Sequence, residues 1–286
     1  MLWDITGRSS EDVLHRALRS RTLRRPQHPV LPRASTAWAG LPRAGLLVRH
    51  NTLLLLRDPG PLVGRLVMPV VVMLALRPLY VAAEGPAGAG QAAIGALVTF
   101  SLPALSIVGG SILSERVWHT WDRLRVAPVR PFELLVGKAV PAFGVLAAQQ
   151  AVVLTAGVVF CGVTVRSPGL LGVACAAWGL ALLAMGSAVG VTARSFGQLS
   201  ATFDIGGFCL TNVGGAMVPL AVLPGWVRDV APASPGYWAA TTLRHASAGE
   251  APQTLRGVAV LLAVAAASGA FAAWRIRHGW GRAEAG

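Results

Sequence analysis

The sequence predicts an all-α protein that crosses a membrane several times, and three observations lead to this fold class. The chain of 286 residues is 54% hydrophobic and only 13% charged, which is about half the charged fraction of a typical soluble domain. Its apolar residues form long continuous runs, without the alternation expected of a transmembrane β-barrel. Its basic residues are concentrated in alternate segments between those runs.

Six apolar runs approach the roughly 20 residues that a helix needs to cross a bilayer. The first is short and carries Arg77, and the fifth is the least uniform because Asp204 and Asn212 interrupt it. A basic N-terminal arm (1–44) and a C-terminal tail (276–286) flank the predicted membrane domain (45–275). The predicted spans cover residues 66–83, 92–113, 140–163, 170–193, 200–222 and 257–274.

The placement of basic residues predicts the orientation of these spans. With the N-terminus in the cytoplasm, twenty of the 25 basic residues fall on inner segments and four on outer loops, as the positive-inside rule expects. Both termini are therefore predicted to be cytoplasmic. Because this topology accounts for most of the net charge of +13, we expect no nucleic-acid partner. All basic residues except Lys138 are arginine, and alanine, glycine and proline are abundant, which favours a bacterial cytoplasmic membrane.

A basic, apolar segment precedes the first span. Leu53 to Leu56 form an apolar patch flanked by Arg49 and Arg57, and Asp58-Pro59-Gly60 then interrupts any helix. This pattern predicts either a helix lying in the inner membrane interface or an ordinary cytosolic helix.

The sequence contains no recognisable catalytic, metal or nucleotide-binding motif. Gly137-Lys138 is not a phosphate-binding loop, because Phe132 occupies the required glycine position and Ala139 follows the lysine. The three cysteines lack metal-ligand spacing. We therefore expect no catalytic residue, no metal and no cofactor in this chain.

The most informative segment lies between the second and third predicted spans. Glu115, His119 and Asp122 share one face of a predicted helix, with aromatic and apolar side chains beside them. The segment is either a short helix that contacts a partner or a solvated loop with interfacial tryptophans. The candidate contact residues are Glu115, Arg116, Trp118, His119, Thr120, Trp121, Asp122, Leu124 and Pro128.

This segment resembles the cytoplasmic motif of ABC-2 type ABC-transporter permeases, which is close to E-R-E-x-G-T-x-E-x-L-x-x-T-P followed by G-K. The chain departs from that pattern at Val117, His119 and Ala127, and Asp122 replaces a glutamate. Two further stretches resemble the family, one at Arg57-Asp58-Pro59 and one from Gly214 to Trp238. The matching motif residues are Glu115, Arg116, Thr120, Leu124, Pro128, Gly137 and Lys138.

The resemblance implies a six-helix permease subunit of an ATP-driven exporter. It implies a homodimer or heterodimer above two separate ATPase subunits, which would bind the ATP, with residues 115–128 as the coupling element. The family also places the first and fifth spans at the dimer interface and along the substrate path.

The cargo is predicted less directly. Short outer loops favour a drug, an antibiotic or another hydrophobic small molecule, so that efflux would give antibiotic resistance. The alternatives are a lipid or polysaccharide exporter of the same class, or an ion-coupled secondary transporter. Asp204 and Asn212 either line a transport path or make polar contacts within the membrane, and lipid is an expected partner.

Overall fold

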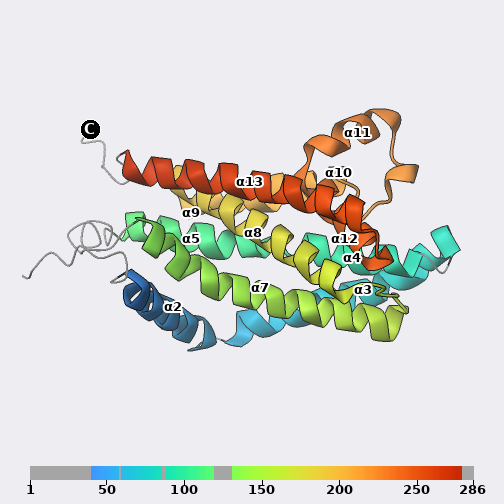
Figure 1. Cartoon of the computed structure of the whole chain (residues 1–286), viewed down its shortest axis with the longest axis horizontal. Coiled ribbons are helices and arrows are strands. Elements are labelled where there is room, and N and C mark those ends of the chain that lie inside the picture. The colour runs from blue at the N-terminus through green and yellow to red at the C-terminus, as the bar shows by residue number, and fades with distance from the viewer. Residues whose placement is uncertain (1–39, 58, 86–87, 119–130, 279–286) are drawn as a thin grey trace, which may run out of the picture. The chain divides into compact units, whose positions relative to one another are not determined.

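The computed structural model describes residues 40–57, 59–85, 88–118 and 131–278, which form helices joined by turns, with no strand among them (Figure 1). The predicted N-terminal arm and C-terminal tail lie largely outside these ranges. Within these described ranges, five helical stretches are long and apolar enough to cross a membrane, and each overlaps a predicted span. They are Leu62–Glu84, Gly88–Val117, Val136–Cys161, Pro168–Thr192 and Ala251–Arg277.

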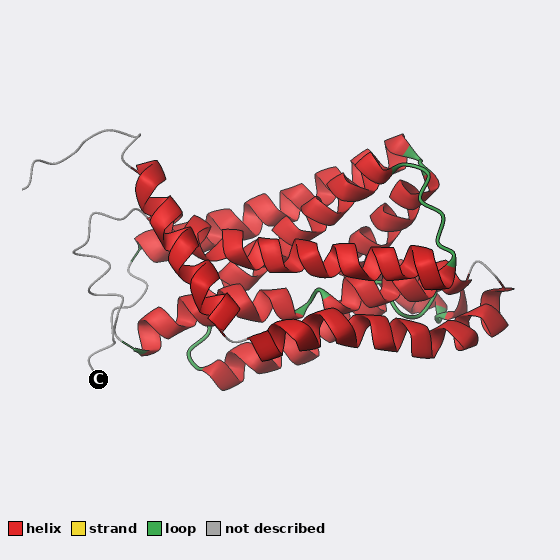
Figure 2. Cartoon of the chain, turned by 90° about the horizontal axis from the view of Figure 1, so that it is seen from below, coloured by secondary structure: helices red, strands yellow, loops and turns green. Residues whose placement is uncertain are grey.

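The predicted break before the first span is confirmed. Helix α2 (Gly40–Arg57) ends at Arg57, and α3 (Pro59–Glu84) begins at Pro59, where a proline is favourable because the first helical N–H has no intrahelical partner. Helix α2 runs obliquely to the long helices (Figures 1 and 2) and packs mainly against α7 (Pro131–Cys161).

The second predicted span is divided into two helices, α4 (Gly88–Phe100) and α5 (Pro103–Val117). Pro103 cannot donate a backbone hydrogen bond, and the Ala104 N–H donates to the Ser101 carbonyl (3.0 Å) rather than to that of Phe100. The Gln149 side chain of α7 donates to the Phe100 carbonyl instead. A polar side chain on a neighbouring helix thus satisfies a backbone group freed by the break, as the membrane interior requires.

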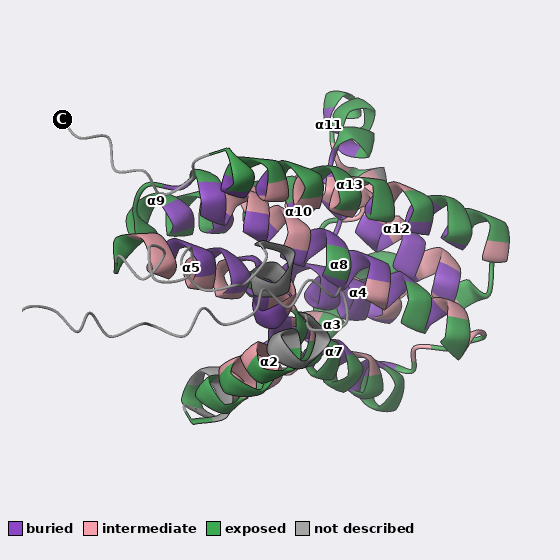
Figure 3. Cartoon of the chain, turned by 60° about the vertical axis from the view of Figure 1, so that its left-hand side comes forward, coloured by how far each residue is buried: buried purple, intermediate pink, exposed green. Residues whose placement is uncertain are grey.

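Helix α8 (Pro168–Thr192) lies at the centre of the packing, where it contacts α5, α7, α12 (Pro235–Ala248) and α13 (Ala251–Arg277). Figure 3 shows many buried residues along α8, and Trp178 is fully buried there.

Small residues allow α8 and α5 to approach closely. A Cβ atom added to Gly190 would lie 2.7 Å from the Gly109 Cα, and one added to Gly186 would lie 2.6 Å from the Leu105 carbonyl oxygen. The Gly186-x-x-x-Gly190 pattern therefore marks a real helix crossing of the small-residue type.

The fifth predicted span differs most from the structure. Its helix comprises α9 (Phe196–Ala201), a π-helical segment (Thr202–Gly207) and α10 (Phe208–Val213), together about 27 Å long at 1.5 Å per residue. It ends at Val213, well before Val222, because Gly214 lies against the Tyr237 backbone nitrogen and Gly215 adopts a left-handed φ of 74°. A sixth crossing therefore stays a prediction.

Three helices hold the turn that follows α10. Side chains of Tyr80 (α3), Gln91 (α4) and Arg244 (α12) donate to the carbonyls of Met217, Ala216 and Gly215, respectively, and the last two bonds measure 3.0 and 2.8 Å. Burial lowers the pKa of the Arg244 guanidinium, an effect that Glu84 and Tyr237 oppose. Helix α11 and two short 3-10 turns complete the connection to α12. Their bounds are Leu220–Val222, Gly225–Val230 (α11) and Ala231–Ala233.

We predict that Gln149→Leu lowers the free energy of unfolding by about 1–2 kcal/mol, because it leaves the Phe100 carbonyl without a donor. Thermal unfolding of the purified chain in detergent measures this change. Gln150→Leu is the matched control, since the Gln150 amide nitrogen has no hydrogen-bond partner among the described residues. Equal losses in the two variants would contradict the assignment.

We also predict that Gly190→Ala destabilises the chain by about 1–3 kcal/mol, because its methyl group would push α8 away from α5. Gly172→Ala on the same helix serves as the control, as an added Cβ there meets no atom within 4 Å. Both changes replace glycine with alanine and so raise the helix propensity equally. The difference between their unfolding temperatures therefore measures the effect of the methyl group on the α5–α8 contact. If Gly190→Ala were as stable as Gly172→Ala, the close crossing would be disproved.

Candidate functional site

The candidate site is the end of α5 and the beginning of α7, between which the predicted coupling segment lies. Of its predicted residues, Glu115, Arg116 and Trp118 are described. The remaining six lie outside the described residues, so the structure does not test their placement. They are His119, Thr120, Trp121, Asp122, Leu124 and Pro128.

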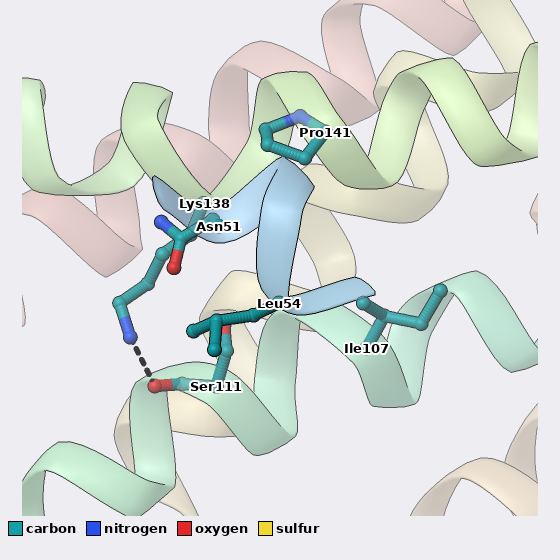
Figure 4. A pocket seen from close by; sticks show the side chains of 6 residues that line it. All are labelled: Asn51, Leu54, Ile107, Ser111, Lys138 and Pro141. Atoms are coloured by element: carbon teal, nitrogen blue, oxygen red, sulfur yellow. Dashed lines mark hydrogen bonds between the residues drawn. The ribbon is translucent and has the colours of Figure 1, made fainter. Parts of the chain in front are cut away.

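An ion pair joins the two sides of this segment. The Lys138 Nζ atom lies 2.8 Å from Glu115 Oε1, and their side chains are only 7% and 21% exposed. Lys138 also donates to the Ser111 carbonyl one turn earlier on α5 (Figure 4). The pair therefore ties the end of α5 to the first turns of α7. Removal of either side chain would leave the charge of the other largely buried.

The residues beyond the ion pair are more accessible. Trp118 caps the C-terminal end of α5, and 69% of its surface is exposed. Such a large exposed indole is unusual unless lipid headgroups or another protein cover it. Trp118 is therefore available for the contact role that its sequence position predicts.

Helix α2 is attached to the same part of α7. The Asn51 side-chain amide donates to the Gly137 carbonyl (3.0 Å), and a Cβ atom added to Gly137 would lie 2.7 Å from the Leu47 Cβ. The Gly-Lys pair therefore has two structural tasks: the glycine admits α2, and the lysine binds α5.

A pocket of about 260 Å³ lies where these three helices meet. Asn51 and Leu54 line it from α2, Ile107 and Ser111 from α5, and Lys138 and Pro141 from α7. Figure 4 shows the Lys138 side chain extending across this space toward Ser111. The pocket separates α2 from α5, so the contact of α2 with the bundle depends chiefly on α7.

Sequence reasoning named Lys138 only as part of a family motif and missed Asn51 and Ser111. One signal was available for the lysine, which is the single lysine of the chain. No sequence signal identified Ser111, because its backbone carbonyl, rather than its side chain, accepts the lysine.

The two predicted intramembrane polar residues occupy different environments. Asp204 lies exposed on the π-helical segment, and no ion pair joins it to another described residue. The Asn212 side-chain amide donates to the Phe208 carbonyl of its own helix (2.8 Å). The structure therefore does not bring Asp204 and Asn212 together into one polar site.

These features define a polytopic helical membrane protein with a polar joint at the end of two spans. The family model described as ABC-2 type transporter matches residues 43–247. The chain therefore belongs to the ABC-2 type transporter family, as its motifs predicted, and it is the membrane permease component rather than the ATPase. No curated protein and no solved structure matches the chain significantly.

We predict that Glu115→Gln and Lys138→Met each lower the free energy of unfolding by about 3 kcal/mol. Each change removes one charge of a largely buried ion pair and leaves the opposite charge in place. The double variant should lose less than the sum of the single losses, since it removes both charges. Chemical denaturation of the four proteins in detergent provides this cycle. Additive losses would show that the pair contributes no coupling.

Proposed function

We propose that this chain is the membrane-spanning permease subunit of an ATP-driven exporter and is coupled to a separate ATPase subunit through residues 115–128. Membership of the ABC-2 family supports the class of transporter. The observation that carries the coupling role is the buried Glu115–Lys138 ion pair at the base of that segment. A force applied to the segment would reach α5 and α7 together through this pair.

The proposed topology has six crossings, with both termini in the cytoplasm. Five long apolar helical stretches in the described part of the chain support it, and α9, the π-helical segment and α10 would supply the additional crossing. Helix α13 ends with Arg275 and Arg277, α5 with Arg116. Figure 1 places these two helix ends at the same side of the bundle as α2, and a shared cationic end suits the cytoplasmic face of a bacterial membrane.

In this proposal ATP binding closes two ATPase subunits beneath a dimer of permeases, and the coupling segment transmits the closure. Helix α2 would follow α7, because the Asn51 hydrogen bond and the close Leu47–Gly137 contact join them. Either a homodimer or a heterodimer fits. The large exposed apolar surface of α3, which includes Val67, Met68 and Val71, would contact lipid or the second permease.

We propose a drug, an antibiotic or another hydrophobic small molecule as the cargo. The short connections among the described residues, such as Gly162–Ser167 between α7 and α8, provide no large outer domain to receive a polymer. A lipid or polysaccharide exporter of the same class is the main alternative. Stimulation of ATP hydrolysis in the reconstituted complex by candidate compounds would distinguish them.

The coupling role is tested by transport measurements on Glu115→Ala and Thr120→Ala. Both should lower ATP-dependent efflux, by about tenfold or more, while membrane insertion stays intact, because each changes the coupling segment and neither changes the apolar spans. Asp229→Ala, which removes an exposed carboxylate on α11, is the control and should transport normally.

Three outcomes would count against the proposal. Unchanged efflux by the two variants at equal protein level would remove the coupling role. Transport that persists after ATP depletion would instead favour an ion-coupled transporter, for which Asp204 would be the candidate carboxylate. Labelling of position 119 from outside the cell would place the coupling segment on the wrong side of the membrane.

A further inference from the structure

A second pocket, of about 350 Å³, lies between α12 and the first two turns of α13. Figure 1 places these turns at the end of the bundle away from α2. The polar residues that characterise the pocket are Thr241, His245, Gln253 and Arg256, with Trp238 beside them. None of the described residues that line it is a carboxylate, and Arg256 is the lining residue that is always charged.

The cationic group of this pocket is available for a ligand. Arg256 forms no hydrogen bond or ion pair with any residue in the described part of the chain, and its side chain is exposed. A guanidinium presents five N–H donors in a planar fork that fits phosphate and carboxylate oxygens. An arginine that lines a concave site without a protein partner therefore favours an anionic ligand.

His245 adds a second, oriented donor or acceptor. Its Nδ1 atom lies 2.6 Å from Glu250 Oε2, and this contact fixes the imidazole ring. The opposite ring nitrogen, Nε2, makes no hydrogen bond to any residue in the described ranges. Glu250 thus positions the histidine from outside the pocket, and in the imidazolium form the other ring nitrogen carries an N–H that can donate to an anion.

The pocket also has a rigid floor and an aromatic side. Gly257 lies so close to Thr242 that an added Cβ atom would overlap the threonine hydroxyl oxygen. That hydroxyl is buried and has no hydrogen-bond partner in the described part of the chain. Trp238 donates its indole N–H to the Pro232 carbonyl (2.9 Å) and stands edge to face with Tyr237. These contacts hold the aromatic wall in place.

We propose that this pocket binds an anionic phosphate or carboxylate group through Arg256 and His245, with Trp238 against the apolar part of the same ligand. Its position at the end of the long apolar helix α13 is the depth at which headgroups and tryptophans meet. The source of the anion is either a phospholipid headgroup or a free anion. The proposal depends on α13 spanning the membrane and is independent of ATP coupling and of the cargo.

The first arm of the test measures lipid binding to the purified full chain by native mass spectrometry. The chain is exposed to equal amounts of phosphatidylglycerol and phosphatidylcholine in detergent. Arg256→Gln and His245→Gln should each reduce retained phosphatidylglycerol, the former by about tenfold because charge-assisted hydrogen bonds are lost. Arg256→Lys keeps the charge but not the planar fork, so it should reduce retention less than Arg256→Gln. Arg228→Gln is the matched control, since Arg228 is exposed on α11 and does not line the pocket.

The second arm measures thermal unfolding of lipid-depleted chain in inorganic phosphate against chloride at equal ionic strength. A phosphate-dependent rise in unfolding temperature that Arg256→Gln abolishes and Arg228→Gln keeps would identify a free anion as the ligand. Lipid retention that depends on Arg256 would identify the headgroup. If neither arm depends on Arg256, or if Arg228→Gln produces the same losses, the pocket is not an anion site. Because efflux is not measured, failure here leaves the proposed transport function untouched.

Discussion

The Gln149 amide donates to the Phe100 carbonyl. This hydrogen bond compensates for the break between α4 and α5 within the second span. In hydrocarbon an unsatisfied carbonyl destabilises the fold, so an interruption of a span favours a donor from elsewhere. The same constraint explains the turn after α10, where Tyr80, Gln91 and Arg244 reach three successive carbonyls. At both of these interruptions, side chains of neighbouring helices compensate for the lost backbone hydrogen bonds.

The proposed functional end of the molecule follows a different rule. There the important groups are charged, and burial makes them interdependent. The buried Lys138 ammonium group is stabilised by the carboxylate of Glu115 and by the Ser111 carbonyl. The preceding residue, Gly137, lies against α2, so three helices converge on two consecutive residues. A displacement of the coupling segment would act on α2, α5 and α7 at one point rather than on each helix separately.

Much of this arrangement was predictable because it depends on composition and local pattern. Long apolar runs predicted the spanning helices, and Pro59 predicted where α2 gives way to α3. The division of the second span was missed, although Ser101 and Pro103 are visible in the sequence, since membrane helices often tolerate a proline. The early end of the fifth predicted span depends on how closely Gly214 approaches α12, which only the folded chain reveals.

The functional contacts were harder to predict, because they join residues distant in sequence. Glu115 and Lys138 were both recognised as motif positions, but no pattern indicates that they bind each other across the segment between α5 and α7. Asn212 carried a polar signal in an apolar run, yet it serves its own helix. A motif thus indicates which residues matter, whereas the packing decides what they contact.

The scarcity of lysine has a chemical consequence. Lys138 is the single lysine among 286 residues, so the chain contains one side-chain primary amine, and the ion pair covers it. Acylating and amine-crosslinking reagents therefore have one side-chain target, and they reach it only when the joint between α5 and α7 opens. The rate at which that amine reacts therefore reports how often the joint between α5 and α7 opens, and no lysine has to be introduced to measure it.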